Sequence, residues 1–300
     1  MSSPSERPVR TPQPTRRQLL VASAGLGAAV GLAACGGKGE STVPEGAANS
    51  NALLASFPQS VPYVPAGVPT RLPYLISDPE GVPLAAITGP VTFTVSSGGD
   101  VIGEVEVLPR SDGVPRAYLP LEFTFDEPGY YDVVAEYEGQ SLDSQLQVFE
   151  RKEVPPPVVG EQLPVAPTPT TLNSLEVDPI CTQVPACPYH EVTLQEALDS
   201  GKRVVLLVAT PAYCQTAVCG PTLDNLMAIV GDRDDLVVVH TEVYRQPKTE
   251  SDLSQAPLAP LPEAYGLAFE PTMFVTDTKG TITARADIII DRSEMTELLA

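Results

Sequence analysis

The chain has 300 residues, 43% hydrophobic and 19% charged, which gives enough apolar sequence for globular cores and enough length for about two domains. Its formal net charge is −20, and a chain this acidic repels phosphate backbones, so a nucleic-acid partner is excluded. The 33 prolines, each without a backbone N–H, predict long loops and a β-rich architecture.

Residues 1–34 have the pattern of a bacterial export signal. Two arginines at positions 16 and 17 precede an apolar run of small residues that is too short and too rich in glycine for a membrane span. The letters LAAC, ending at Cys35, resemble a lipobox, and TRRQLL resembles a twin-arginine (Tat) signal. These resemblances imply an exported lipoprotein, anchored by lipid at Cys35 to the extracytoplasmic face of the bacterial membrane. A plain signal peptide and an uncleaved anchor are the alternatives.

An all-β region follows a flexible tether. The tether is expected over residues 35–58, which are small and polar. Residues 59–150 alternate apolar and polar side chains in short runs separated by turn signals, the pattern of a β-sandwich domain. The predicted strands are 91–95, 101–107, 121–125, 131–137 and 142–149. The letters EPGYYDVVAEYEG resemble the late hairpin of immunoglobulin-like (Ig-like) domains. A scaffold and a binding module are both open roles for this region.

A proline-rich linker is expected over residues 151–172, where polyproline-like sequence makes a semi-rigid spacer. Residues 173–300 then change to an α/β pattern. A capping box at Thr193–Glu196 opens a short helix, and continuous apolar runs predict buried strands. The further predicted elements are strands 204–208, 236–243, 273–276 and 281–286, a helix over 221–230 and a C-terminal helix.

This order of elements and two motifs resemble the thioredoxin family. The letters YGLAFEPTMFV match its Tyr-Gly and Pro-Thr segment, and LLVATPAYCQ matches the strand that leads to its reactive cysteine. The resemblance implies a thioredoxin-like domain over 173–300, with Cys214 as nucleophile and Tyr213 in place of the family's Trp. It also implies that Pro271 is cis and lies with Thr272 beside the sulfur. The predicted fold class is therefore multidomain, an all-β Ig-like sandwich followed by an α/β thioredoxin-like domain.

The second cysteine stands two residues later than in the family's Cys-x-x-C motif. Five helical residues rotate the chain by about 500° and raise it by about 7.5 Å, so Cys214 and Cys219 cannot be paired across a regular helix. Because proline is tolerated in a first helical turn, Pro221 indicates a helix that begins near Gly220, after a loop that holds the pair. An alternative alignment puts Cys219-Gly220-Pro221 on the family's Cys-Gly-Pro. The same overall pattern resembles exported bacterial lipoproteins with Cys-x4-Cys-Gly-Pro.

Two residues depart from the family pattern. Val208 stands where thioredoxins keep a buried acid that assists proton transfer. Glu270 precedes the expected cis-proline, where an uncharged residue is usual, and a carboxylate near the sulfur would raise the pKa of the thiol. The redox behaviour is therefore expected to differ from that of cytosolic thioredoxin.

Four cysteines remain once Cys35 carries lipid, and an even number in an exported protein favours two disulfides. Cys181 and Cys187 lie among prolines, and a structural disulfide is expected between them. The pair Cys214 and Cys219 is open to three interpretations: a redox dithiol, a structural disulfide or a metal site. Copper with His240 as a ligand is the metal candidate; otherwise no cofactor is expected. His190, which follows the Cys181–Cys187 loop, is expected at the surface.

The sequence favours a membrane-anchored thiol–disulfide oxidoreductase in which Cys214 attacks and Cys219 resolves. Its partners would be thiols and disulfides of exported proteins. The alternatives are a non-catalytic binding or scaffold lipoprotein with structural disulfides, and a copper- or haem-assembly factor, so enzymatic activity is left open.

Overall fold

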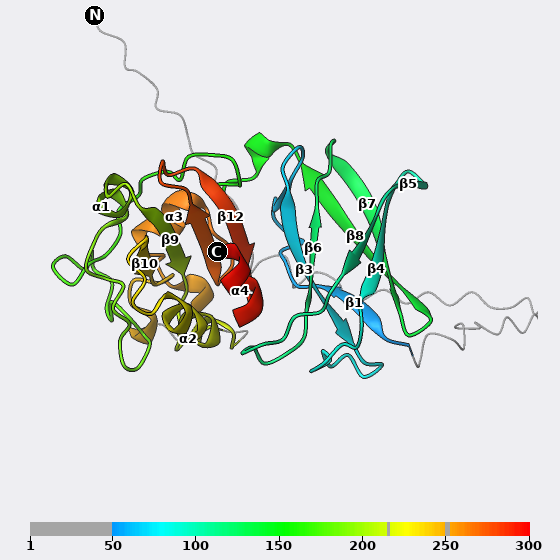
Figure 1. Cartoon of the computed structure of the whole chain (residues 1–300), viewed down its shortest axis with the longest axis horizontal. Helices are drawn as coiled ribbons and strands as arrows, with labels where there is room; N and C mark the ends of the chain where they lie inside the picture. The colour runs from blue at the N-terminus through cyan, green and yellow to red at the C-terminus, as the bar shows by residue number, and fades with distance from the viewer. Residues whose placement is uncertain (1–49, 215–216, 250–252) are drawn as a thin grey trace, which may run out of the picture. The chain divides into compact units, whose positions relative to one another are not determined.

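The computed structural model describes residues 50–214, 217–249 and 253–300 (Figure 1). The expected export signal, the lipid site at Cys35 and most of the expected tether lie outside the described residues. Within them, twelve strands form three sheets and four α-helices are present, with 34% strand and 16% helix. Residues from Gly46 to Ala300 belong to one compact unit.

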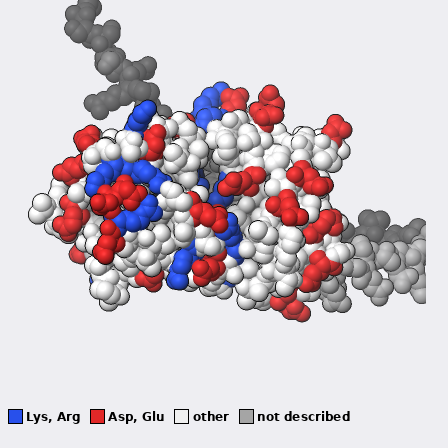
Figure 2. Space-filling model, viewed as in Figure 1, with Lys and Arg blue, Asp and Glu red and all other residues white. Residues whose placement is uncertain are grey.

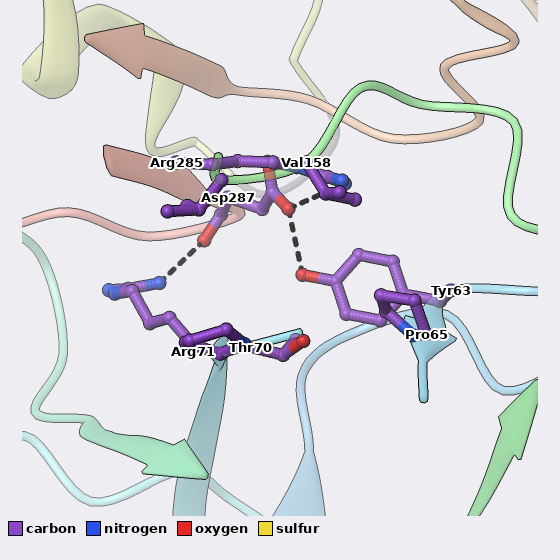
Figure 3. A pocket seen from close by; sticks show the side chains of 9 residues that line it. Tyr63, Pro65, Thr70, Arg71, Val158, Arg285 and Asp287 are labelled. Atoms are coloured by element: carbon purple, nitrogen blue, oxygen red, sulfur yellow. Dashed lines mark hydrogen bonds and ion pairs between the residues drawn. The ribbon is translucent and has the colours of Figure 1, made fainter. Parts of the chain in front are cut away.

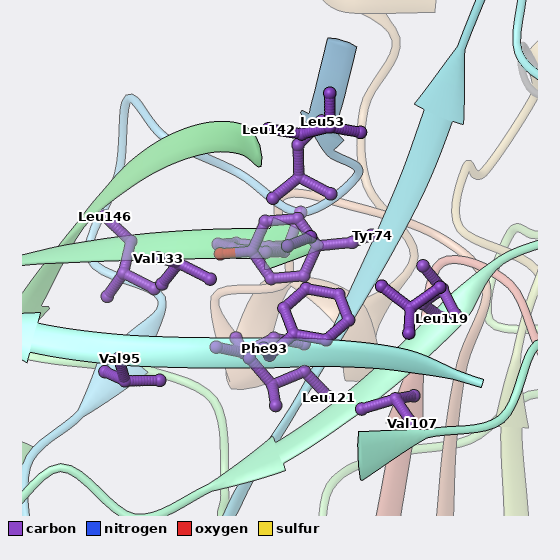
Figure 4. Packing of buried hydrophobic residues seen from close by; sticks show 14 of the residues in the cluster. Leu53, Tyr74, Phe93, Val95, Val107, Leu119, Leu121, Val133, Leu142 and Leu146 are labelled. Carbon is purple, nitrogen blue, oxygen red and sulfur yellow. The ribbon is translucent and has the colours of Figure 1, made fainter. Parts of the chain in front are cut away.

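The first two sheets enclose one apolar core. The three-stranded sheet has the order β1 (Ala52–Ala55), β3 (Thr70–Ser77), β6 (Leu119–Phe123). The five-stranded sheet has the order β2 (Val64–Pro65), β8 (Gln140–Phe149), β7 (Gly129–Tyr137), β4 (Val91–Ser97), β5 (Asp100–Val107). Strand β4 alternates as a half-buried strand must, since Val91, Phe93 and Val95 are buried. Tyr74 of β3 packs on Phe93 with ring centroids 5.5 Å apart (Figure 4).

The third sheet has the order β10 (Leu236–Thr241), β9 (Arg203–Val208), β11 (Thr272–Thr276), β12 (Ile282–Asp287). Strands β9 and β10 are parallel and the other pairs are antiparallel. Successive side chains alternate across a strand, so β9 contributes to the apolar clusters on both faces of the sheet. Val205 and Leu207 belong to one cluster, and Leu206 and Val208 belong to the other. The helices are α1 (Leu194–Asp199), α2 (Cys219–Val230), α3 (Pro260–Tyr265) and α4 (Arg292–Leu298).

The expected fold class is wrong. The described residues are mostly β, with three sheets and four helices, and they show no α/β thioredoxin-like arrangement. Three of the four helices have only six or seven residues, as a chain rich in proline favours. The chain from Gly46 onward is also a single compact unit, although separate Ig-like and α/β domains were expected.

Parts of the expected tether and linker are ordered in the fold. Strand β1 lies within the tether range 35–58. The linker range 151–172 begins with a 3-10 turn, Arg151–Glu153, and then runs beside β12. There Gly160 N donates to Ile282 O at 2.9 Å, and Leu163, which is buried, donates to Gly280 O at 2.9 Å. These hydrogen bonds make the segment part of the folded unit.

A buried polar network joins β3 to the segment that leads into α4. The guanidinium of Arg71 donates to both carboxylate oxygens of Glu294, at 2.5 and 2.7 Å, and to the carbonyls of Asp287 and Ile289. Tyr63 donates to Asp287 at 2.8 Å in the same region (Figure 3). Both side chains of the Arg71–Glu294 pair are nearly inaccessible, so this pair is a core contact between two ends of the sequence.

The distribution of charged side chains and the lengths of the helices can be compared with the sequence. Figure 2 shows Asp and Glu side chains scattered over one face, with Lys and Arg in a few places among them. Among the described residues, no helix combines the length and the apolar character needed to cross a bilayer.

Candidate functional site

Two clusters of thiols lie where the chain leaves the carboxyl end of β9. Strand β9 ends at Val208, and Ala209 and Thr210 follow it. Their backbone groups make a contact with each cluster, as described below. The first, the dithiol cluster, consists of Cys214, Cys219 and Glu270; the second, the Cys/His cluster, consists of Cys181, Cys187, His190 and His240.

The dithiol cluster combines a partly exposed thiol with a fully buried one. Cys214 lies on the loop after β9, whereas Cys219 is the first residue of α2 and has no exposed surface. Their sulfur atoms and a carboxylate oxygen of Glu270 all lie within 4.8 Å of one another. Cys214 thus precedes the helix, which resolves the problem of pairing two cysteines five residues apart.

The carboxyl group of Glu270 is fixed between backbone and sulfur. Its Oε2 accepts a hydrogen bond of 2.6 Å from Thr210 N and one of 3.5 Å from Cys219 Sγ. The peptide bond between Glu270 and Pro271 is cis, and Thr272 opens β11 as a buried residue. Sequence reasoning marked Glu270 only as a departure from a family pattern, but the structure makes it the acidic member of the cluster.

Burial and charge shift the acidities of this cluster upward. Burial raises the pKa of Cys219 well above its usual value, and the Cys214 thiol and the Glu270 carboxylate raise it further. Burial also raises the pKa of Glu270 to about 7, with a further contribution from negative charge at Cys214. A carboxyl group of that acidity can both accept and donate a proton near neutral pH.

A pocket of about 220 Å³ opens beside Cys214, lined by Ser56, Cys214, Tyr244, Ala268, Phe269, Glu270 and Ile288. A second pocket of about 330 Å³ shares four of these residues, Tyr244 and Ala268–Glu270, and continues along apolar side chains. Cys214 is therefore reached from an apolar recess. Tyr213, the expected neighbour of the nucleophile, is partly buried, and its backbone N donates to Thr210 O at 3.1 Å.

The Cys/His cluster brings together residues for which the sequence indicated separate roles. Cys181, Cys187 and His190 come from an irregular segment before α1, and His240 comes from β10. One ligand atom from each of the four lies within 4.8 Å of those of the other three, and all four residues are buried. His190, which was expected at the surface, is only 3% exposed. A lone histidine in a loop carries no sequence signal of this burial, so His190 was missed.

Neither the expected Cys181–Cys187 disulfide nor a Cys214–Cys219 disulfide is formed in this structure. The hydrogen bond between the first two thiols lowers the pKa of Cys181, with the imidazoles of His190 and His240 contributing less. The same hydrogen bond and burial raise the pKa of Cys187. The pair therefore loses its first proton much more readily than its second.

A buried carboxylate supports the segment that holds Cys181. Glu242 accepts a hydrogen bond of 2.7 Å from Thr182 N and another of 3.1 Å from its hydroxyl. The same hydroxyl accepts a hydrogen bond of 3.1 Å from Ala212 N, on the loop that leads to Cys214. Thr182 thus connects the surroundings of the two clusters.

Comparison with known proteins adds no identification. No family model and no curated protein matches the chain. Among solved structures, an engineered protein aligns with 34% of this chain at 16% identity and a TM-score of 0.24, and the alignment covers 20% of that protein. The ZirS C-terminal domain aligns with 47% of this chain at 14% identity and a TM-score of 0.22, with 94% of that domain covered. Similarity this weak identifies neither fold nor function.

Proposed function

We propose that this protein is a thiol–disulfide oxidoreductase whose reacting sulfur atoms belong to Cys214 and Cys219. The observation that carries the proposal is the contact between the buried thiol of Cys219 and the carboxyl group of Glu270, beside a partly exposed thiol within 4.8 Å. A structural disulfide needs no proton acceptor, whereas a dithiol that exchanges electrons needs one for its buried member.

The first step uses the accessible sulfur. The Cys214 thiolate attacks one sulfur of a substrate disulfide, an S–S bond forms between enzyme and substrate, and the substrate's own S–S bond breaks. The departing substrate thiolate takes a proton from solvent. The pocket beside Cys214 supports this order, because it exposes that sulfur and keeps Cys219 covered.

The second step uses the buried sulfur and its carboxylate. Glu270 accepts the proton of Cys219, and the resulting thiolate attacks the Cys214 sulfur and breaks the mixed disulfide. The second substrate sulfur departs as a thiolate and takes the proton held by Glu270. The products are two substrate thiols and a Cys214–Cys219 disulfide, so two electrons pass to the substrate. The same steps in reverse oxidise a substrate dithiol.

Exported proteins are the proposed substrates. The support comes from the sequence, in which an export signal and a lipobox-like motif ending at Cys35 precede the folded unit. The apolar recess of about 220 Å³ beside Cys214 suits a cysteine within an apolar segment, as an incompletely folded protein presents.

A trapping experiment tests the proposal. Cys219→Ser mixed with an oxidised model peptide should hold that peptide as a mixed disulfide on Cys214, detected by intact mass and mapped by proteolysis. The matched control, Cys214→Ser, should form no lasting adduct.

The reduction potential of the wild-type pair provides an independent measurement. A value within the range of exchanging dithiols, above about −300 mV, is expected. A lower value, together with no adduct in Cys219→Ser, would show that the pair is a structural disulfide and would remove the proposal.

A further inference from the structure

We propose that the Cys/His cluster is a closed tetrahedral site for one Zn²⁺ ion, with Cys181, Cys187, His190 and His240 as its four ligands. This site uses none of the residues of the dithiol cluster, and it goes beyond thiol exchange. It is argued from the separations of the ligand atoms, the direction of their lone pairs, and their burial and charge.

The separations match the edges of a zinc tetrahedron. With Zn–S near 2.3 Å and Zn–N near 2.0–2.1 Å, the edges are about 3.3 Å between two nitrogens and about 3.5 Å between sulfur and nitrogen. Here His190 Nε2 and His240 Nδ1 are 3.3 Å apart, and Cys187 Sγ is 3.3 Å from each of them. Cys181 Sγ is 3.9 Å from His240 Nδ1. The other two separations, from Cys181 Sγ to Cys187 Sγ and to the ligand nitrogen of His190, are within 4.8 Å, so Cys181 is the ligand that would move inward on binding.

The hydrogen bonds of His240 direct its lone pair at the cluster. Its Nε2 lies 3.0 Å from Ala209 O, and a carbonyl oxygen only accepts, so Nε2 carries the proton. In the neutral ring Nδ1 then has a free lone pair, which faces the sulfur atoms and His190. This arrangement, with one ring nitrogen bonded to a backbone carbonyl and the other free, is typical of histidine that binds a metal.

His190 supplies a second, independent observation. Its Nδ1 is buried and has no hydrogen-bond partner among the described residues, while its Nε2 faces Cys187 and His240. A metal bond would use the lone pair of Nε2, the nitrogen that faces the other ligands, and would place the ring proton on Nδ1.

Charge favours a divalent ion such as Zn²⁺ over Cu⁺. Binding converts two thiols to thiolates and releases two protons, so Zn²⁺ with two thiolates and two neutral imidazoles makes a neutral centre. Cu⁺ in the same site would leave one negative charge buried, near Glu242, whose own pKa is raised to about 8 by burial and further by negative charge at Cys181. All four ligands are buried, and a tetrahedral sulfur–nitrogen site without an open position is structural rather than catalytic.

The metal content of the purified full chain tests the assignment. Wild-type protein prepared under reducing conditions should contain one zinc per chain, and Cys187→Ser and His190→Ala should each lose it. The matched control removes the other pair: Cys214→Ser/Cys219→Ser should keep one zinc. Loss of zinc in this control, with retention in Cys187→Ser, would place the metal on the dithiol cluster and overturn the assignment.

Measurements on the wild-type chain cover the case in which a ligand variant fails to fold. Cobalt added to chelator-treated protein should release the thiol protons and give the intense visible absorption of a tetrahedral thiolate complex, and zinc should then displace cobalt with no further release of protons. A chain that takes up neither ion although its thiols are free, or one in which Cys181 and Cys187 form a disulfide, refutes the proposal. Preferential uptake of one Cu⁺ with no zinc refutes the choice of ion.

Discussion

Glu270→Gln should stabilise the reduced protein at neutral and alkaline pH while slowing its thiol exchange. Burial raises the pKa of Glu270 from 4.5 to about 7, so the folded protein holds this proton more tightly than the unfolded chain does. Stability that is fully present below pH 4.5 is therefore lost as the pH rises through 7. Glutamine carries no titrating proton, and its side-chain oxygen can still accept from Thr210 N, so the variant escapes this loss.

The size of the stability effect follows from the pKa of Glu270, which is about 7 in the folded protein and 4.5 for an unperturbed glutamate, a difference of about 2.5 pKa units. At about 1.36 kcal/mol for each pKa unit it amounts to about 3.4 kcal/mol, and solvent screening of a partly exposed group reduces it to about 2–3 kcal/mol. Losing the proton acceptor of Cys219 should slow the second step of exchange by about 10²-fold or more.

Urea unfolding of the reduced chain at pH 5, 6, 7 and 8 measures the stability effect. The advantage of Glu270→Gln over wild type should grow across this range. Glu122→Gln, which neutralises an exposed carboxylate on β6, is the matched control. A constant difference for Glu270→Gln, or exchange as fast as in wild type, would refute the assigned role of the carboxyl group.

Three further predictions concern individual side chains. Arg71→Met should lower the free energy of unfolding by about 3–5 kcal/mol, because it leaves the buried Glu294 carboxylate unpaired; adding Glu294→Leu should recover much of this in a denaturant-based double-mutant cycle. Arg110→Gln should cost less than about 1 kcal/mol in the same assay, since its partner Glu297 is 63% exposed, and a larger loss would contradict the low value given to that pair. Tyr244→Ala, which opens the recess beside Cys214, should raise KM for an apolar disulfide peptide more than it lowers kcat; unchanged kinetics would exclude the recess as the substrate site.

The positions of several elements follow from local sequence. The apolar run predicted as a strand over 204–208 is β9, Arg203–Val208, and the helix predicted over 221–230 is α2, Cys219–Val230. Buried strands and capping residues act over a few positions, so one sequence is enough to locate them.

How those elements pack together could not be predicted from the sequence. The ion pair between Arg71 and Glu294 joins residues that are 223 positions apart in the sequence, and no local sequence pattern indicates it. The expected fold class was wrong for this reason. His190 was misplaced for a similar reason, because its burial depends on how an irregular loop meets β10. Glu270 was noticed for its charge, but its contact with Cys219 needed the fold.

The peptide unit between Ala209 and Thr210 has a consequence for both clusters. Its carbonyl oxygen accepts from His240, and its N–H donates to Glu270, so one amide dipole lies in series between an imidazole and a carboxyl group. Hydrogen bonds joined in this way polarise one another. Thermodynamic reciprocity then requires that if a cation at His240 shifts the redox equilibrium of the dithiol, oxidation of the dithiol shifts the affinity for that cation by the same factor. If both proposals hold, the redox state of the dithiol and the occupancy of the metal site are therefore coupled through this one peptide group.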